Sequence, residues 1–212
     1  MTRRRRRPKK RRTELPLEPY LAYLVFAAIG LGTYRLGQDG RLVLLWVLLL
    51  AATLVYVDRR PLPFEYALTK MGQGGAIGLI LGVPLVILAS ETLRATAGRL
   101  YPLGNGTLLF QGVVLVAAPV EEAFFRGVLQ KEHGFWPAAA LYGLAGIVFF
   151  LPAVAGFPAV LIATAVGMAV LGIVYGYVAL RYGLAASIAC HAVVNLTLFV
   201  LPVALGSLGE GG

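Results

Sequence analysis

The feature of this sequence that most constrains its fold is a series of seven apolar segments, each about as long as a membrane crossing. A helix needs about 20 apolar residues to cross the hydrocarbon core of a bilayer, which is about 30 Å thick. The segments lie approximately at residues 18–36, 42–57, 73–95, 107–131, 136–154, 158–180 and 184–204. They predict an all-α fold, a polytopic membrane helix bundle of about seven transmembrane helices. The composition agrees, because 58% of the residues are hydrophobic and only 14% are charged.

A strongly basic stretch precedes the first apolar segment. Nine of the 19 Lys and Arg residues lie within residues 3–12. Such a cluster beside a membrane span predicts a cytoplasmic N-terminus that contacts anionic lipid headgroups, rather than a nucleic-acid-binding protein. The basic residues that then fall on the cytoplasmic side are Arg59, Arg60, Lys70, Lys131 and Arg181, and those that fall outside are Arg35, Arg41, Arg94 and Arg99. We therefore expect a multi-pass protein of the cell membrane, with membrane lipids as partners and no nucleic-acid partner.

The chain divides into four parts, none of which is a separate soluble domain. Residues 58–66 contain two prolines and several charges, and predict a surface loop that could carry an interfacial helix. Cys190 is the only cysteine, which excludes an intramolecular disulfide. The predicted parts are a basic cytoplasmic tail at 1–17, transmembrane helices and loops at 18–106, a transmembrane core at 107–204 and a flexible C-terminal tail at 205–212.

The fourth apolar segment carries three ionisable residues, Glu121, Glu122 and Arg126. Each ionised group at the centre of a membrane helix costs about 2.5–3.5 kcal/mol even on the lenient insertion scale, so such groups usually mark a functional site. Glu122 and Arg126 are spaced i to i+4 and predict an ion pair on one helix face. Glu121 points about 100° away, which leaves it unpaired and available as a general base. Pro119 removes a backbone donor just before the pair and should open the helix there.

The last apolar segment carries a second polar motif, His191 and Asn195, again at i and i+4. At about 1.5 Å per residue, Glu121 lies about 15 Å from Lys131, and His191 lies about 15 Å from Arg181. These two basic residues mark the same membrane boundary, so we expect the two motifs to face each other at one depth. The alternatives are a buried structural ion pair and a histidine–asparagine contact that only holds two helices together.

Both motifs resemble those of the CAAX protease and bacteriocin-processing (CPBP) family of intramembrane glutamic endopeptidases. The resemblance lies in Glu121-Glu122-Ala-Phe-Phe-Arg126, the E-E-x-x-x-R motif, and in His191-Ala-Val-Val-Asn195, the H-x-x-x-N motif, and covers about residues 107–200. It implies that Glu121 activates water, that Glu122 and Arg126 support it, and that His191 and Asn195 stabilise the oxyanion. The catalytic residues that it implies are Glu121, Glu122, Arg126, His191 and Asn195.

The chain departs from this family in its middle motif, F-x-x-x-H. The position of the histidine is taken by Ala153 or Val154, depending on which phenylalanine is aligned. The other histidine, His133, lies about 18 Å beyond Glu121 along the helix. Tyr142 or a water molecule could take over the role. Two hypotheses therefore remain: an endopeptidase that hydrolyses a peptide bond in a cytoplasmic-side cavity, and a catalytically impaired relative that binds and regulates a membrane partner.

Two further chemistries are less favoured. Glu121, Glu122 and His191 could in principle hold zinc, but the sequence lacks the H-E-x-x-H motif. The carboxylates could also serve a proton-coupled transporter, but the chain shows no paired broken helices in corresponding positions. We therefore expect neither a metal ion nor another cofactor.

Overall fold

The computed structural model describes residues 18–58, 60–62 and 64–209, so the basic tail at 1–17 lies outside the described residues. Within these ranges the chain forms helices and no strands. Six helices are long and apolar enough to cross a membrane, and they confirm the predicted polytopic bundle. The first helix, α1 (Pro19–Gly32), has only 14 residues. Its length is about 21 Å, less than the thickness of the hydrocarbon core, so the predicted span at 18–36 is too long.

The remaining helices follow the predicted order. After α1 come α2 (Gln38–Val57) and α3 (Leu68–Leu100). The fourth membrane helix is continuous but changes its winding along its length, through α4 (Gly106–Phe110), η1 (Gln111–Ala117), α5 (Ala118–Glu122), η2 (Ala123–Leu129) and α6 (Gln130–His133), where the η segments are π-helical. Then come α7 (Phe135–Val154), α8 (Pro158–Tyr182), α9 (Leu184–Asn195), the π-helical η3 (Leu196–Val200) and α10 (Leu201–Gly209).

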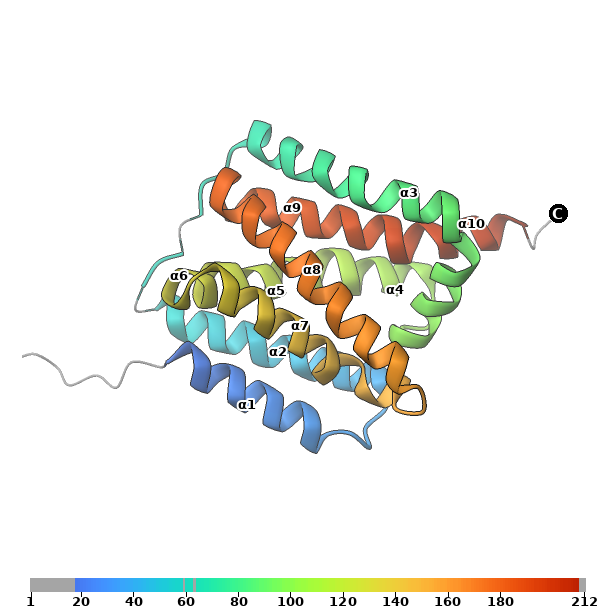
Figure 1. Cartoon of the computed structure of the whole chain (residues 1–212), viewed down its shortest axis with the longest axis horizontal. Coiled ribbons are helices and arrows are strands. Elements are labelled where there is room, and N and C mark those ends of the chain that lie inside the picture. The colour runs from blue at the N-terminus through green and yellow to red at the C-terminus, as the bar shows by residue number, and fades with distance from the viewer. Residues whose placement is uncertain (1–17, 59, 63, 210–212) are drawn as a thin grey trace, which may run out of the picture.

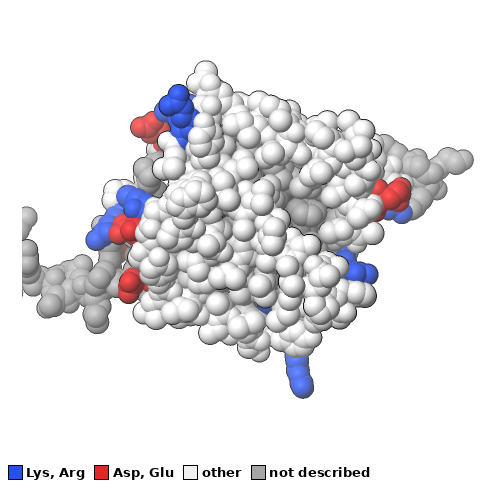
Figure 2. Space-filling model, in the orientation of Figure 1, with Lys and Arg blue, Asp and Glu red and all other residues white. Residues whose placement is uncertain are grey.

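The helix running from α4 to α6 passes through the middle of the bundle (Figure 1). Helices α3 and α9 pack along each other on one side of it, and α1 and α2 lie on the other side. Helices α7 and α8 form a second closely packed pair that crosses the others at an angle. Figure 2 shows charged side chains mostly at the two ends of this face, with an uncharged band between them. That band is the surface expected of a protein whose middle faces lipid.

Two glycines set the ends of the central helices. Gly134 separates α6 from α7 with φ +90°, and Gly183 separates α8 from α9 with φ +95°. Glycine adopts this region readily because it has no Cβ. Each glycine therefore ends one membrane helix and starts the next within a single residue.

Helices α3 and α9 approach so closely that only glycines fit between them. A Cβ added to Gly74 would lie 2.0 Å from the carbonyl oxygen of Ala186, and one added to Gly82 would lie 1.9 Å from the hydroxyl of Thr197. With Gly78 these residues form a small-residue stripe at four-residue spacing, a common basis of helix packing in membranes. The stripe holds α9, which carries His191, against α3.

Arg41, which the sequence analysis assigned to the outer side of the membrane, packs inside the bundle. Its side chain is fully buried in the bundle, where it donates hydrogen bonds to the backbone carbonyls of Gly30, Val148 and Phe149. Pro152, four residues after Val148, has no N–H for the carbonyl of Val148. The guanidinium of Arg41 therefore satisfies the backbone oxygen of Val148 that the proline leaves unpaired.

The sequence predicted two non-helical stretches, a loop at 58–66 and a tail at 205–212, and the structure agrees with the first but not with most of the second. The described residues between Val57 and Leu68 form no helix, so this stretch is a connector and carries no interfacial helix. The predicted flexible tail at 205–212 is helical as far as Gly209, because α10 continues the last membrane helix. Residues 210–212 lie outside the described residues.

Candidate active site

The two glutamates lie on one turn of regular helix between two π-helical segments. Segment α5 holds Glu121 and Glu122, with η1 before it and η2 after it. π-Helical turns often occur at functional sites, and here Pro119 stands where the winding changes. Both carboxylates are buried, with 5% of Glu121 and none of Glu122 exposed. The predicted opening of the helix at Pro119 thus takes the form of a change in winding.

Glu122 is the most fully satisfied group of the site. Its Oε2 lies 3.4 Å from Nε of Arg126, which confirms the predicted ion pair on one helix face. The hydroxyl of Ser187 donates to the same oxygen at 2.5 Å, and Nδ1 of His191 lies 3.0 Å from Oε1. A buried carboxylate is stable only with such partners, so Glu122 joins the fourth membrane helix firmly to α9.

The sequence predicted an unpaired Glu121, but the carboxylate accepts two hydrogen bonds. The indole Nε1 of Trp46 donates to its Oε1 at 3.1 Å, and the hydroxyl of Tyr142 donates to its Oε2 at 3.0 Å. Trp46 comes from α2 and Tyr142 from α7, so the carboxylate is held from two sides by neutral donors. Each carboxylate oxygen can accept a second hydrogen bond, which leaves both oxygens able to bind water.

His191 lies between the two glutamates. While Nδ1 faces Glu122, Nε2 is 4.0 Å from Oε2 of Glu121 and 3.4 Å from the hydroxyl of Tyr142. The imidazole also stacks on the ring of Tyr175, with centroids 4.5 Å apart and an interplanar angle of 16°. These distances confirm that the two motifs face each other at one depth.

Asn195 and Arg126 each have a second, structural contact. The side-chain amide of Asn195 donates to the carbonyl of Val113 in η1 at 2.8 Å, which uses one of its two N–H groups. Arg126 donates to the carbonyl of Gly172 at 3.1 Å. Its guanidinium carbon lies 4.3 Å from the ring centroid of Tyr142, a cation–π contact. Both residues therefore fix the helices around the site.

A cavity of about 570 Å³ reaches the site. Glu121, Tyr142, His191 and Asn195 all line it, and most of its other walls are apolar side chains of α3, α8 and η3. A water molecule occupies about 30 Å³ in the liquid, so there is room for several waters or for a short stretch of peptide. The site therefore combines a carboxylate, an imidazole and an amide around one space.

The cavity lies toward the end of the bundle opposite to the start of α1. Its lining includes the C-terminal part of α3, up to Tyr101, and the first half of α8, from Ala159 to Leu171. These parts lie toward the end of the bundle opposite to α6, which contains Lys131, and to the start of α1 (Figure 1). The cavity therefore opens away from the end of the bundle at which α1 begins, the end that the sequence analysis expects to be cytoplasmic.

The position of the missing histidine is filled by the core. Val154 is buried in the hydrophobic core and Ala153 packs against it, and neither lines the cavity. The polar neighbour of Glu121 on α7 is instead Tyr142, three helical turns earlier. His133 lies away from the site, as predicted, with its ring stacked on Tyr20 at 3.7 Å. Among the described residues, no group of three His, Cys, Asp or Glu side chains is arranged to hold a metal ion.

Two residues of the site were missed in the sequence, Trp46 and Ser187, whereas Tyr142 had been considered as a replacement for the missing histidine. Ser187 lies four residues before His191, on the same helix face, so its spacing could have revealed it. Nothing in the sequence connects Trp46 with Glu121, because the two residues lie on different helices far apart in the chain.

Comparison with known proteins agrees with this geometry. A family model described as Rce1-like, type II CAAX prenyl endopeptidase, matches residues 103–197. The matched segment begins just before α4, ends within η3 and contains both motifs. Over these residues, somewhat less than half of the chain, the sequence is similar to CAAX-type endopeptidases. No curated protein and no solved structure gave a significant match. The matched segment thus supplies all the polar residues of the site except Trp46, which α2 contributes from outside that segment.

Proposed function

We propose that this protein is an intramembrane endopeptidase that hydrolyses a peptide bond with water activated by Glu121. The observation that carries the proposal is the position of the Glu121 carboxylate, 4.0 Å from the imidazole of His191 on the wall of a cavity of about 570 Å³. A base, a hydrogen-bond donor and space for a substrate between them are the parts that hydrolysis requires. The match of residues 103–197 to a family model of CAAX prenyl endopeptidases supports the same activity.

The charges of the site balance in a form suited to this reaction. In the proposed reactive state His191 is protonated, so His191 and Arg126 carry two positive charges that balance the two negative charges of Glu121 and Glu122. Buried charges are tolerated only when they are compensated in this way. In this state Glu121 can accept a proton, and His191 can donate from both ring nitrogens, one of them to Glu122.

The reaction follows from these positions. Glu121 takes a proton from a water molecule while the water oxygen bonds to the peptide carbonyl carbon. The oxyanion that forms accepts hydrogen bonds from Nε2 of His191 and from the second N–H of Asn195. Protonated Glu121 then gives its proton to the peptide nitrogen, and the C–N bond breaks to leave a carboxylic acid and an amine.

Tyr142 takes the place of the missing histidine as the partner of the base. Its hydroxyl lies between Glu121, at 3.0 Å, and His191, at 3.4 Å. It therefore orients the carboxylate together with Trp46, and it offers a path for a proton between the carboxylate and the imidazole. A phenol at this position accounts for a functional site without a second buried histidine.

The orientation that we propose has the N-terminus in the cytoplasm of a cell-membrane protein, as the basic residues indicate. The cavity would then open toward the outer half of the membrane, and substrates would reach Glu121 from that side. Fluorescent-protein and alkaline-phosphatase fusions at the N-terminus would report the side of the tail directly.

The test compares two glutamates in the reconstituted full-length chain. Wild-type protein is incubated with solubilised membrane proteins, new peptide termini are identified by mass spectrometry, and the best substrate is used for kinetics. Glu121→Gln should lower the rate about 10²–10⁴-fold, the usual contribution of a general base. Glu132→Gln is the matched control, because Glu132 pairs with Arg60 at the membrane edge and should leave the rate unchanged. Cleavage that is equally fast in Glu121→Gln would overturn the proposal in favour of a binding function.

A further inference from the structure

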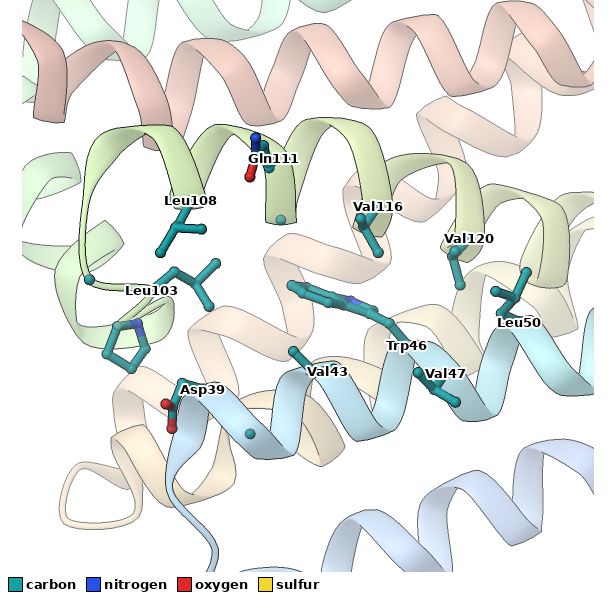
Figure 3. A pocket seen from close by; sticks show the side chains of 14 residues that line it. Asp39, Val43, Trp46, Val47, Leu50, Leu103, Leu108, Gln111, Val116 and Val120 are labelled. Carbon is teal, nitrogen blue, oxygen red and sulfur yellow. The ribbon is translucent and has the colours of Figure 1, made fainter.

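A second cavity, of about 590 Å³, opens between α2 and the helix formed by α4, η1 and α5 (Figure 3). We call it the lateral groove, and its lining includes Asp39, Val43, Trp46, Leu50, Leu108 and Val116. Nearly all of its walls are apolar, and Asp39 stands at one end. Several lining side chains are exposed at the lipid-facing surface, with exposed fractions of 52% for Val43 and 41% for Val116. The groove is therefore open to the bilayer from the side.

The dimensions of the lateral groove match one leaflet of a membrane. From Asp39 to Leu50 it extends along α2 for about 16 Å, and half of a hydrocarbon core of about 30 Å is about 15 Å. Asp39 lies at the start of α2, at the bundle end where this core meets the headgroups. Its side chain is exposed and forms no ion pair with any described residue.

We propose that the lateral groove binds one acyl chain of a zwitterionic, amine-bearing phospholipid, whose ammonium group contacts Asp39. The apolar walls provide the contact area for the chain, because burying apolar surface is favourable at about 25 cal/mol per Å². The single acidic group at the headgroup end selects a lipid with a positive charge over one with only a negative charge. The occupant comes from the bilayer itself, which surrounds the open side of the groove.

The lateral groove is linked to Glu121 through Trp46. The ring of Trp46 extends from α2 into the groove, while its Nε1 donates to Glu121 on the other side. Only 3% of this side chain is exposed. A bound chain would pack against the indole ring and hold its N–H on the carboxylate. The lipid would thus support the orientation of the base, a consequence that rests on the proposed function, whereas the binding itself does not.

The experiment measures quenching of Trp46 fluorescence by brominated lipid. The chain has two tryptophans, and Trp136 is 68% exposed, so Trp136→Phe leaves Trp46 as the only one. This variant is reconstituted into vesicles with increasing fractions of phosphatidylethanolamine brominated along its acyl chain. Trp46 lies about 10 Å below Asp39 along α2, so bromines at that depth should quench most strongly. Quenching should saturate at a low fraction of brominated lipid, as for one site.

Matched variants in the same Trp136→Phe background locate the site. Val43→Phe fills the groove and should abolish the saturable quenching, whereas Leu54→Phe adds the same ring at an exposed position outside the groove and should leave it unchanged. Asp39→Asn should remove the preference for phosphatidylethanolamine over phosphatidylglycerol.

Quenching that rises in proportion to the brominated fraction and is the same in Val43→Phe would overturn the proposal. Saturable quenching by a bromoacylated peptide, with none by the phospholipid, would also overturn it and identify a lipid-modified substrate instead. Because the readout needs no proteolysis, failure here leaves the proposed hydrolysis untouched. If the wild-type protein shows no hydrolysis, the proposed lipid site is unaffected, because the quenching measures binding alone.

Discussion

Replacing Tyr142 by phenylalanine tests the partner of the proposed base directly. The change removes one hydroxyl, which donates to Glu121 at 3.0 Å and lies 3.4 Å from His191. The ring stays, with its edge-to-face contact to Phe125 at 5.0 Å and its cation–π contact to Arg126 at 4.3 Å. The fold of the site should therefore survive, and the effect should be chemical.

The magnitude follows from the lost hydrogen bond. A hydrogen bond to a charged group contributes about 1.5–3 kcal/mol, and each 1.4 kcal/mol is a factor of about ten in rate. Tyr142→Phe should thus lower kcat about 10–100-fold if the bond is lost in the transition state. KM should change little, because the hydroxyl contacts the catalytic groups rather than the bulk of the cavity wall.

The matched control is Tyr175→Phe, measured with the same substrate in the same vesicles. Tyr175 also lies in the site, where its ring stacks on His191, but its hydroxyl has no hydrogen-bond partner among the described residues. Removing that hydroxyl should leave kcat close to the wild-type value. Equal losses in the two variants, or full activity in Tyr142→Phe, would refute the role assigned to Tyr142.

Two further substitutions test the packing that holds the site. Gly74→Ala should destabilise the protein by about 1–3 kcal/mol, because its Cβ would meet the carbonyl oxygen of Ala186. In the control Gly75→Ala, the nearest atom to the new Cβ lies at 3.6 Å, so this variant should be neutral or more stable. Thermal unfolding in detergent micelles compares the two variants, and equal melting temperatures would contradict the close approach of α3 and α9. Arg41→Met should lower the free energy of unfolding by about 3 kcal/mol or more, because it leaves buried carbonyls such as that of Val148 without a donor. Denaturant titration in mixed micelles measures this loss, and an unchanged midpoint would show that the carbonyls find other partners.

The number and order of the helices were predictable because apolar length is a local property. Each segment long enough to cross the bilayer became a helix, and the boundary at residues 155–157 is a real break between α7 and α8. The first segment was overestimated. Its predicted range reached residue 36, but the helix ends at Gly32, just before the polar residues Thr33 and Arg35.

The contacts within one helix, or between helices with a shared membrane boundary, were also predictable. Glu122 and Arg126 pair because helical geometry places them on one face. Glu122 meets His191 because both motifs lie at the same distance from basic residues on one side of the membrane. In both cases a count of residues along a helix was enough.

The tertiary structure alone decided which other helices surround Glu121. Trp46 lies 75 positions earlier and Tyr142 lies 21 positions later, and sequence spacing does not show which faces of α2 and α7 turn toward the site. The side on which the cavity opens was equally hidden, because it depends on how far α3 and α8 separate at one end. The sequence by itself determined a membrane bundle with two facing polar motifs, since helix length and helical phase are local. Helix packing then gave the base its two donors and its cavity, because such contacts depend on the shapes of surfaces brought together from distant parts of the chain.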